Sequence, residues 1–195
     1  MPILSFVVRR GKCRHCGGEI PPVTLYAELS AVGLAVASII VWPDPAILLA
    51  GVSVLWVLLA LLMADIIWLR LPDALTLILA VLGIVFGASD PQVGLVPSVL
   101  TGCGAALIFY FIRFSYQKLR KVEGLGLGDV KLIFGIGAMV GPLNIAMVIL
   151  IASVGVLAVG IIGKMRGQSS KRPYAFGAAL CAATILHTLL RFAMI

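Results

Sequence analysis

Residues 123–132 read Glu123-Gly124-Leu125-Gly126-Leu127-Gly128-Asp129-Val130-Lys131-Leu132, and they interrupt a chain that is otherwise mostly apolar. In this stretch, Asp129 follows three alternating glycines and stands at the start of an apolar run. A carboxylate at the edge of a hydrocarbon region is costly, so an acid in this place is a candidate for function.

The composition of the chain indicates a membrane protein. Of its 195 residues, 62% are hydrophobic and only 12% are charged, whereas soluble domains average about 25% charged residues. The mean hydropathy is +1.15. A chain of this length cannot hide so much apolar surface in a small globule, so we expect the lipid bilayer to be its solvent. Arg9 and Arg10 follow an apolar start, the reverse of a secretory signal, so we expect no separate signal peptide.

Turn signals such as Pro43-Asp44-Pro45 and Gly141-Pro142 divide the chain into apolar segments. The fifth segment either merges with the sixth through Gly141-Pro142 or spans the membrane only in part. We predict an all-α fold, a polytopic membrane helix bundle of six to seven transmembrane helices. A short basic cytoplasmic segment, residues 1–24, precedes a transmembrane domain over residues 25–195. The seven segments are residues 25–42, 46–67, 73–88, 93–116, 129–141, 143–163 and 174–194.

The positive charges partition cleanly between the loops. If the segments alternate in direction, fourteen of the fifteen Lys and Arg residues fall on one side of the membrane, and the exception is Arg191. By the positive-inside rule that side, with the N-terminus, is cytoplasmic. The net charge of +7 suits anionic lipid headgroups, so no nucleic-acid partner is needed to explain it.

The same topology brings three acids to one level near the cytoplasmic face: Asp65, Asp73 and Asp129. Asp73 follows Pro72 and opens a helical run, which is typical of a first-turn acid that faces the helix dipole. Asp65 has apolar neighbours on both sides, so we interpret it as functional. Asp129 has a plainer alternative, which is to cap the helix that it starts.

A pair of acids at one depth can hydrolyse a peptide bond. Two close carboxylates cannot both ionise readily, so one takes a proton from water while the other donates a proton to the carbonyl oxygen. We do not assign these roles individually, because such a pair titrates as a unit. Gly124, Gly126 and Gly128 would let an extended substrate reach Asp129 and allow φ above zero. Lys131 either reaches lipid headgroups or pairs with a nearby acid, and we count it with the three glycines as a candidate substrate-binding residue.

The Cys13-Arg14-His15-Cys16 motif has the shape of half a zinc ribbon. A structural zinc ion normally takes four ligands, and a second pair is missing here. We therefore expect no metal at this motif, with Cys13 and Cys16 as a weak zinc candidate, and no cofactor elsewhere.

The residues around the two acids resemble the G-x-G-D-x-K-L signature of type IV prepilin peptidases, which are G-x-G-D intramembrane aspartic proteases. Asp65, followed eight residues later by Asp73 in Pro72-Asp73 and then by Leu75-Thr76, resembles the family's other block. This resemblance gives Asp65 and Asp129 the catalytic positions and makes Asp73 auxiliary. Glu28 and the Ala175-Phe176-Gly177 run are similar to two further family motifs.

The resemblance implies an aspartic endopeptidase of the bacterial cytoplasmic membrane. Its substrates would be type IV prepilins or pseudopilins, whose leaders are short and basic, end in glycine and precede an apolar helix. Long members of the family also carry a domain with two CxxC pairs that methylates the new N-terminus. With one pair in this sequence, the chain resembles a short form, and we expect it to have no methyltransferase activity of its own.

Two other functions fit the same residues. The two aspartates could relay protons or cations in a small transporter or channel component, although the inverted repeats common in transporters are not evident. The chain could instead be a non-enzymatic scaffold of a secretion or pilus assembly, with its acids merely capping helices.

Overall fold

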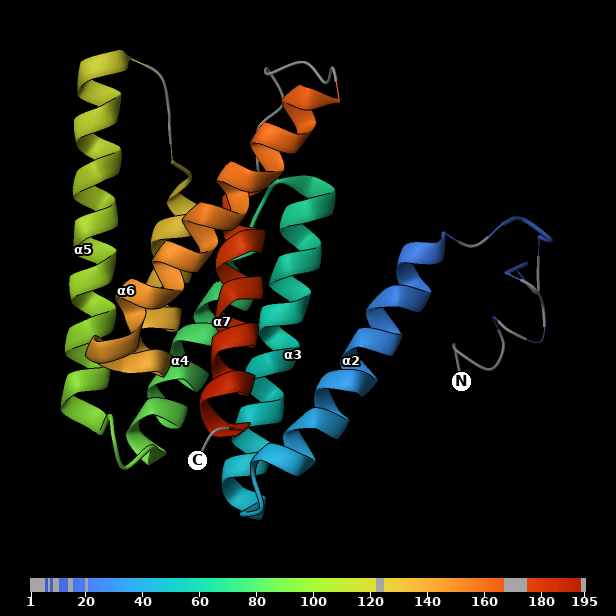
Figure 1. Ribbon diagram of the computed structural model, residues 1–195, viewed down its shortest axis with the longest axis horizontal. Coiled ribbons are helices and arrows are strands. Elements are labelled where there is room, and N and C mark those ends of the chain that lie inside the picture. Colours follow the sequence, from blue (N-terminus) through green and yellow to red (C-terminus); the bar gives the residue numbers. More distant parts are fainter. Residues whose placement is uncertain are drawn as a thin grey trace.

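The computed structural model describes residues 6, 8, 11–13, 16–19, 21–121, 125–166 and 175–193. These residues form a bundle of six named helices (Figure 1). The only strand-like pairing among them is an isolated bridge between Lys12 and Glu19. The predicted all-α fold is therefore confirmed. The helices are α2 (Pro22–Val41), α3 (Pro45–Trp68), α4 (Asp73–Ser89), α5 (Leu95–Arg120), α6 (Leu127–Met165) and α7 (Phe176–Ala193).

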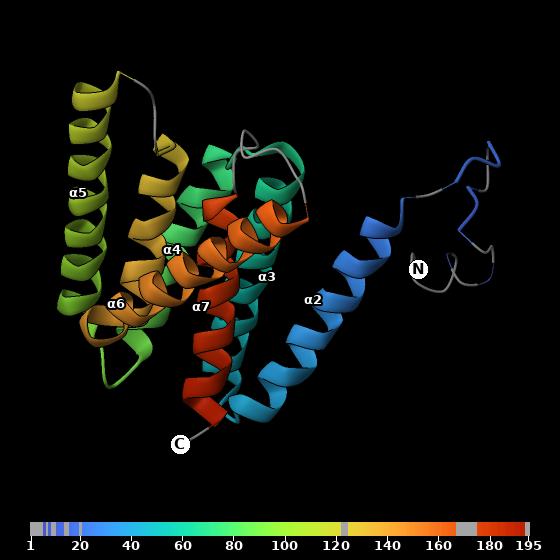
Figure 2. The same cartoon turned by 45° about the horizontal axis from the view of Figure 1, so that its top comes forward.

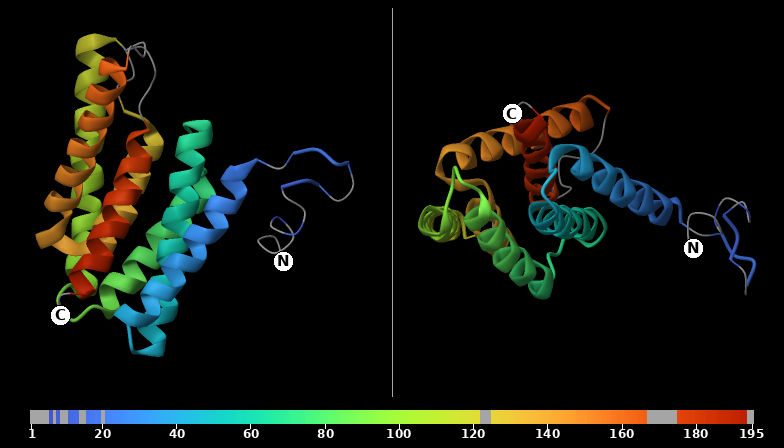
Figure 3. Two further views of the ribbon diagram at one scale, coloured as in Figure 1. Left: turned by 45° about the vertical axis from the view of Figure 1, so that its right-hand side comes forward. Right: turned by 90° about the horizontal axis from the view of Figure 1, so that it is seen from below.

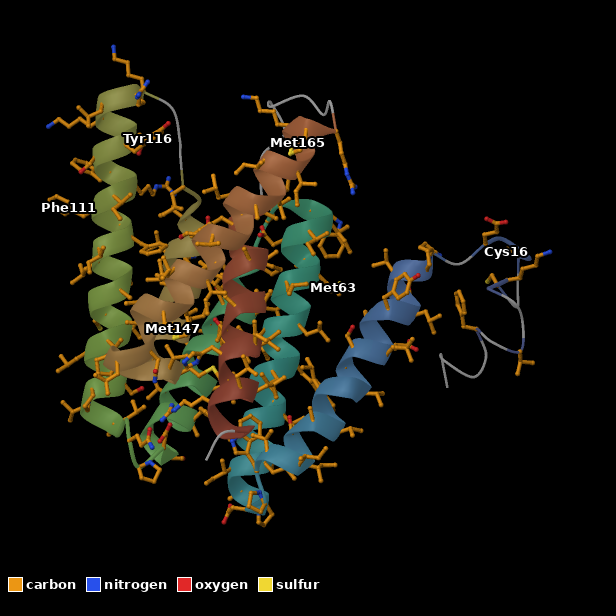
Figure 4. All side chains as sticks on the ribbon, viewed as in Figure 1. Cys16, Met63, Phe111, Tyr116, Met147 and Met165 are labelled. Atoms are coloured by element: carbon orange, nitrogen blue, oxygen red, sulfur yellow. The ribbon has the colours of Figure 1, made fainter. Side chains whose placement is uncertain are left out.

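Four of these helices, α2, α3, α5 and α6, are long and apolar enough to cross a membrane. The other two, α4 and α7, are apolar but shorter. Many large apolar side chains face outward, as they do in proteins whose solvent is lipid. Phe111, for example, is 71% exposed and points away from the bundle in Figure 4. The chain is a membrane protein.

Helix α6 contains the predicted fifth and sixth segments in one element. Its backbone is non-helical at Gly141, where φ is 75° and ψ is 177°, and Pro142 follows. Glycine tolerates this positive φ, and proline lacks the N–H that would continue the helix. The chain reverses here, so both ends of α6 lie at the upper face in Figure 1. Successive segments therefore alternate in direction, as predicted.

The first half of α6 is the buried centre of the bundle, between α4 and α5. A Cβ built at Gly135 would lie 2.8 Å from Leu79 Cγ on α4, so only glycine permits this close approach. On the other side, Ser98 Oγ of α5 donates a 2.6 Å hydrogen bond to the carbonyl oxygen of Ala138. These contacts fix the helix whose first turn carries Asp129.

Helix α2 leans away from the bundle and contacts mainly α3 (Figures 2 and 3). One polar link between the two helices runs from Trp56 Nε1 to the carbonyl oxygen of Ala31, at 3.0 Å. Cys16 lies farther out, in the N-terminal segment, well apart from the helices (Figure 4).

The one basic residue outside the predicted charge pattern has a partner. Arg191 lies near the lower end of α7, and its Nη1 is 2.9 Å from Oδ2 of Asp90. Its Nη2 donates a 2.6 Å hydrogen bond to Oε1 of Gln92. The pair joins the end of α7 to the loop between α4 and α5. Because Asp90 neutralises it, Arg191 can stand at the face opposite to the described cations of α3, α5 and α6.

Candidate active site

Asp65 lies in the last turn of α3, near the upper face of the bundle, and only 6% of it is exposed. The backbone N–H of Ala178, near the start of α7, donates a 2.6 Å hydrogen bond to its Oδ2. The two residues are 113 positions apart in the sequence. Helix α7 therefore holds the carboxylate of Asp65 in place.

Asp129 is the third residue of α6. Its Oδ2 accepts the backbone N–H of Gly126 at 3.3 Å, so the acid does cap the helix. Its other oxygen, Oδ1, points toward α7. The capping role and a role in the site are therefore not exclusive, because each uses a different oxygen of the same carboxylate.

The two acids converge on Gly177. A Cβ built at this glycine would lie 3.0 Å from Oδ1 of Asp129 and 3.0 Å from Oδ2 of Asp65. Since both oxygens are 3.0 Å from one point, they are at most about 6 Å apart. The predicted pairing of Asp65 with Asp129 thus has support in the geometry. Acids at this separation interact and titrate together.

A polar cleft of about 400 Å³ opens beside the two acids. Its charged lining comprises three carboxylates and one guanidinium, that of Arg70, so acids predominate. The cleft is bounded by the end of α3, the start of α4 and the first turn of α6. The lining residues are Asp65, Leu69, Arg70, Leu71, Asp73, Gly126, Gly128 and Asp129.

The glycines before Asp129 act through their small size. Gly126 has a φ of −69°, and neither it nor Gly128 has a positive φ, so the expectation of a positive φ is wrong for these two glycines. A Cβ at Gly128 would lie 3.0 Å from Cβ of Leu71, whereas the hydrogen atom of glycine leaves this side of the cleft open. Gly124 lies outside the described residues.

Asp73 stands at the start of α4, as predicted for a first-turn acid. Its Oδ1 is 2.7 Å from Nζ of Lys131, so Lys131 pairs with an acid. The pair lies at the mouth of the cleft, with Asp73 in its lining. Asp73 is therefore separate from the Asp65–Asp129 pair but close to it.

Two residues of the site were not predicted from the sequence. Gly177 makes room for both carboxylates, and Ala178 supplies the N–H to Asp65. The signal for them was the Ala175-Phe176-Gly177 run, whose resemblance to a family motif gave it no stated role. Phe176 anchors this turn, because its ring stacks on Phe109 of α5 at a centroid distance of 6.3 Å.

Cys13 and Cys16 are the candidate metal ligands of the N-terminal segment. In the described ranges of the chain, no three His, Cys, Asp or Glu side chains come close enough together to hold a metal ion. The pair of cysteines alone offers two of the four ligands that a structural zinc site normally needs.

Fold and site together define a helical membrane protein with a pair of aspartates at one end of its bundle. The chain belongs to the type IV leader peptidase family, which it matches over residues 52–162. Residues 1–42 also match the bacterial peptidase A24 N-terminal domain.

Several curated relatives are similar over nearly the whole of this chain, and three of them, all named prepilin leader peptidase/N-methyltransferase, illustrate the range. One from Burkholderia pseudomallei strain 1026b is 32% identical over 183 residues, which cover 93% of this chain and 59% of that protein. One from Aeromonas hydrophila is 32% identical over 189 residues, which cover 94% of this chain and 63% of that protein. One from Legionella pneumophila is 29% identical over 188 residues, which cover 95% of this chain and 65% of that protein. The chain thus spans about six-tenths of the length of these relatives. No solved structure matches the chain significantly.

Proposed function

We propose that this chain is an aspartic endopeptidase that removes the basic leader from type IV prepilins or pseudopilins. The observation that carries the proposal is the convergence of Asp65 and Asp129 on Gly177, within a chain of the leader peptidase family. The names of its relatives support a prepilin as the substrate.

The two carboxylates divide the work of hydrolysis. The ionised member of the pair takes a proton from a water molecule, which attacks the peptide carbonyl carbon. The protonated member donates its proton to the carbonyl oxygen. Separate backbone N–H groups, from Ala178 and Gly126, hold the two acids in position, so little reorganisation is needed during the reaction.

The cleft suits a positively charged leader. Its lining presents the acids Asp65, Asp73 and Asp129 against the single guanidinium of Arg70. Such an excess of negative charge attracts and orients a basic segment. Gly126 and Gly128 leave room for the substrate backbone to approach Asp129. Lys131 contributes by holding Asp73 at the mouth of the cleft.

The cytoplasmic membrane of a bacterium is the proposed location, with the chain crossing it several times. The described cations other than Arg191 and Lys12 belong to the ends of α3, α5 and α6 that share the upper face. By the positive-inside rule this face is cytoplasmic, which puts the acids on the side where the leader resides. We assign residues 1–24 to a cytoplasmic segment and residues 25–195 to the peptidase domain. A proton or cation relay is not favoured by the family.

The test is leader removal by purified protein in detergent or liposomes, with a type IV prepilin as substrate. Asp65→Asn and Asp129→Asn should each abolish cleavage. Asp73→Asn should keep kcat within a few-fold of the wild-type value, because Asp73 is not part of the pair. Cleavage at the normal rate by either of the first two variants would refute the catalytic assignment.

A further inference from the structure

An apolar groove of about 330 Å³ lies beside the turns of α3 that carry Asp65, and it shares no lining residue with the polar cleft. Its floor is α7, and its walls are α3 and the second half of α6. Viewed from below in Figure 3, α7 lies between these two walls. The lining residues are Leu62, Ile66, Gly155, Val156, Val159, Ala175, Ala178, Ala179 and Ala182.

The groove is joined to the candidate active site through one residue. Ala178 lines the groove, and its N–H holds the carboxylate of Asp65. Leu62 and Ile66, from the same turns of α3 as Asp65, form one wall. A polypeptide that passes the turn of Asp65 and Ala178 toward the apolar side would therefore meet this groove.

The physical state of that polypeptide follows from its surroundings. Inside the bilayer a backbone must satisfy its own hydrogen bonds, so a segment that continues into the apolar region is an α-helix. Helices pack closely in membranes where small residues allow their backbones to approach. Ala178 and Ala182 are four residues apart on α7, as are Ala179 and Ala175, which directly precedes the helix, and together they form such a surface.

The groove leaves open space next to the backbone of α6 at Gly155. A Cβ built at Gly155 meets no atom within 4 Å. The rival groove beside the acids, between α4, α5 and α6, has the Asp73–Lys131 ion pair in its lining together with the ring of Phe134. That lining is less suited to close packing of an apolar helix.

We propose that this groove binds the apolar helix of the substrate that begins just after the cleaved bond. The inference rests on the proposed function and adds a direction to it. The basic leader lies in the polar cleft on the Asp73 side, and the helix leaves past Ala178 along α7. The polar cleft would then bind the basic leader of the substrate, and the apolar groove would bind its apolar helix.

The test compares two glycines that face open space on different surfaces. Gly104 is also helical, its Cβ meets nothing within 4 Å, and it lines a separate apolar groove near Pro142. Gly155→Leu fills the proposed groove, and Gly104→Leu is its matched control. Each variant is assayed with a full-length prepilin and with a short peptide that ends a few residues after the cleaved bond.

For Gly155→Leu, the ratio of kcat/KM on the prepilin to kcat/KM on the peptide should fall about tenfold relative to Gly104→Leu. Equal ratios for the two variants would overturn the groove assignment alone, and would leave a lipid chain as its occupant. Ala106 lines the rival groove, so a fall for Ala106→Leu instead would place the helix there. Failure of the wild-type protein to cut either substrate would overturn the proposed function as well.

A second measurement detects binding of the prepilin directly and does not depend on cleavage. A photo-crosslinking side chain at position 155, in the Asp65→Asn background, should capture the prepilin through its apolar helix. The same side chain at position 104 should not. Equal capture at both positions, or none at position 155, would contradict the proposal.

Discussion

Oδ2 of Asp65 lies 3.0 Å from the position that a Cβ would take at Gly177, although the two residues are far apart in the sequence. Oδ1 of Asp129 is equally close to that position. The start of α7 is thus a third component of a site for which the sequence predicted only two.

Replacement of Gly177 by alanine should slow the reaction at the site. The added methyl group would lie 3.0 Å from an oxygen of each carboxylate and 3.1 Å from Leu71 Cδ1, so these neighbours must shift by a few tenths of an ångström. A displacement of about 1 Å at reacting groups can cost about 100-fold in rate, so for this smaller shift we expect prepilin cleavage to slow by about tenfold or less. Gly104→Ala is the control, because its Cβ meets nothing. Equal rates for the two variants would show that Gly177 does not set the spacing of the acids.

Asp73 should affect substrate binding more than catalysis. Asp73→Asn removes one negative charge from the cleft, so KM for a basic leader should rise several-fold with kcat little changed. The Asp73–Lys131 pair is exposed, with 78% and 50% of the side chains accessible. The free energy of unfolding should therefore change by less than about 1 kcal/mol.

A charge-reversed double variant separates the two contributions of Asp73. Asp73→Lys with Lys131→Asp restores an ion pair but moves the negative charge to α6. If Asp73 attracts the leader directly, KM stays high in this variant. A return of KM to the wild-type value would instead show that only the ion pair matters.

The buried pair at the lower face should be important for stability. The side chains of Asp90 and Arg191 are only 5% and 14% exposed, so Arg191→Met would leave a buried carboxylate without its cation. Breaking such a pair costs about 3–5 kcal/mol, which should appear as a clear fall in Tm in detergent. Lys118→Met, on an exposed position of α5, is the control. Asp90→Asn in the Arg191→Met background should recover part of the loss, and no recovery would contradict an electrostatic cause.

The reversal of α6 should depend on Gly141. An alanine at φ 75° is strained, and its Cβ would lie 2.9 Å from Cγ2 of Val93. We expect Gly141→Ala to destabilise the protein by at least about 1 kcal/mol. Gly104→Ala, in regular helix, should be neutral or slightly stabilising. Thermal unfolding of the two variants provides the comparison, and similar Tm values would rule out a special role for Gly141.

Much of this architecture could be predicted from the sequence, because membrane helices leave local signals. Hydropathy indicated the segments, Gly141-Pro142 marked the reversal, and the distribution of Lys and Arg gave alternating directions. Asp65 and Asp129 stood out because an acid in an apolar run is unusual. Arg191 departs from the charge pattern, and its ion pair with Asp90 explains how a cation can lie at that face.

The remainder depended on contacts that leave no local pattern. The hydrogen bond from Ala178 to Asp65 uses a backbone N–H, which every residue except proline carries. The identity of the side chain at position 178 therefore could not predict it. The conformation of Gly126 could not be derived either. Small size and positive φ both favour glycine, and only the backbone angles showed that small size is the reason here.

The short lengths of α4 and α7 have a consequence for the membrane itself. At 17 and 18 residues, these helices are about 26–27 Å long, less than the ~30 Å hydrocarbon core of a typical bilayer. Both begin beside the two acids, at Asp73 and Phe176, while α5 has 26 residues. This hydrophobic mismatch is relieved if lipid headgroups dip toward the shorter helices. Water would then reach Asp65 and Asp129 through a local thinning of the bilayer, without a separate channel through the protein.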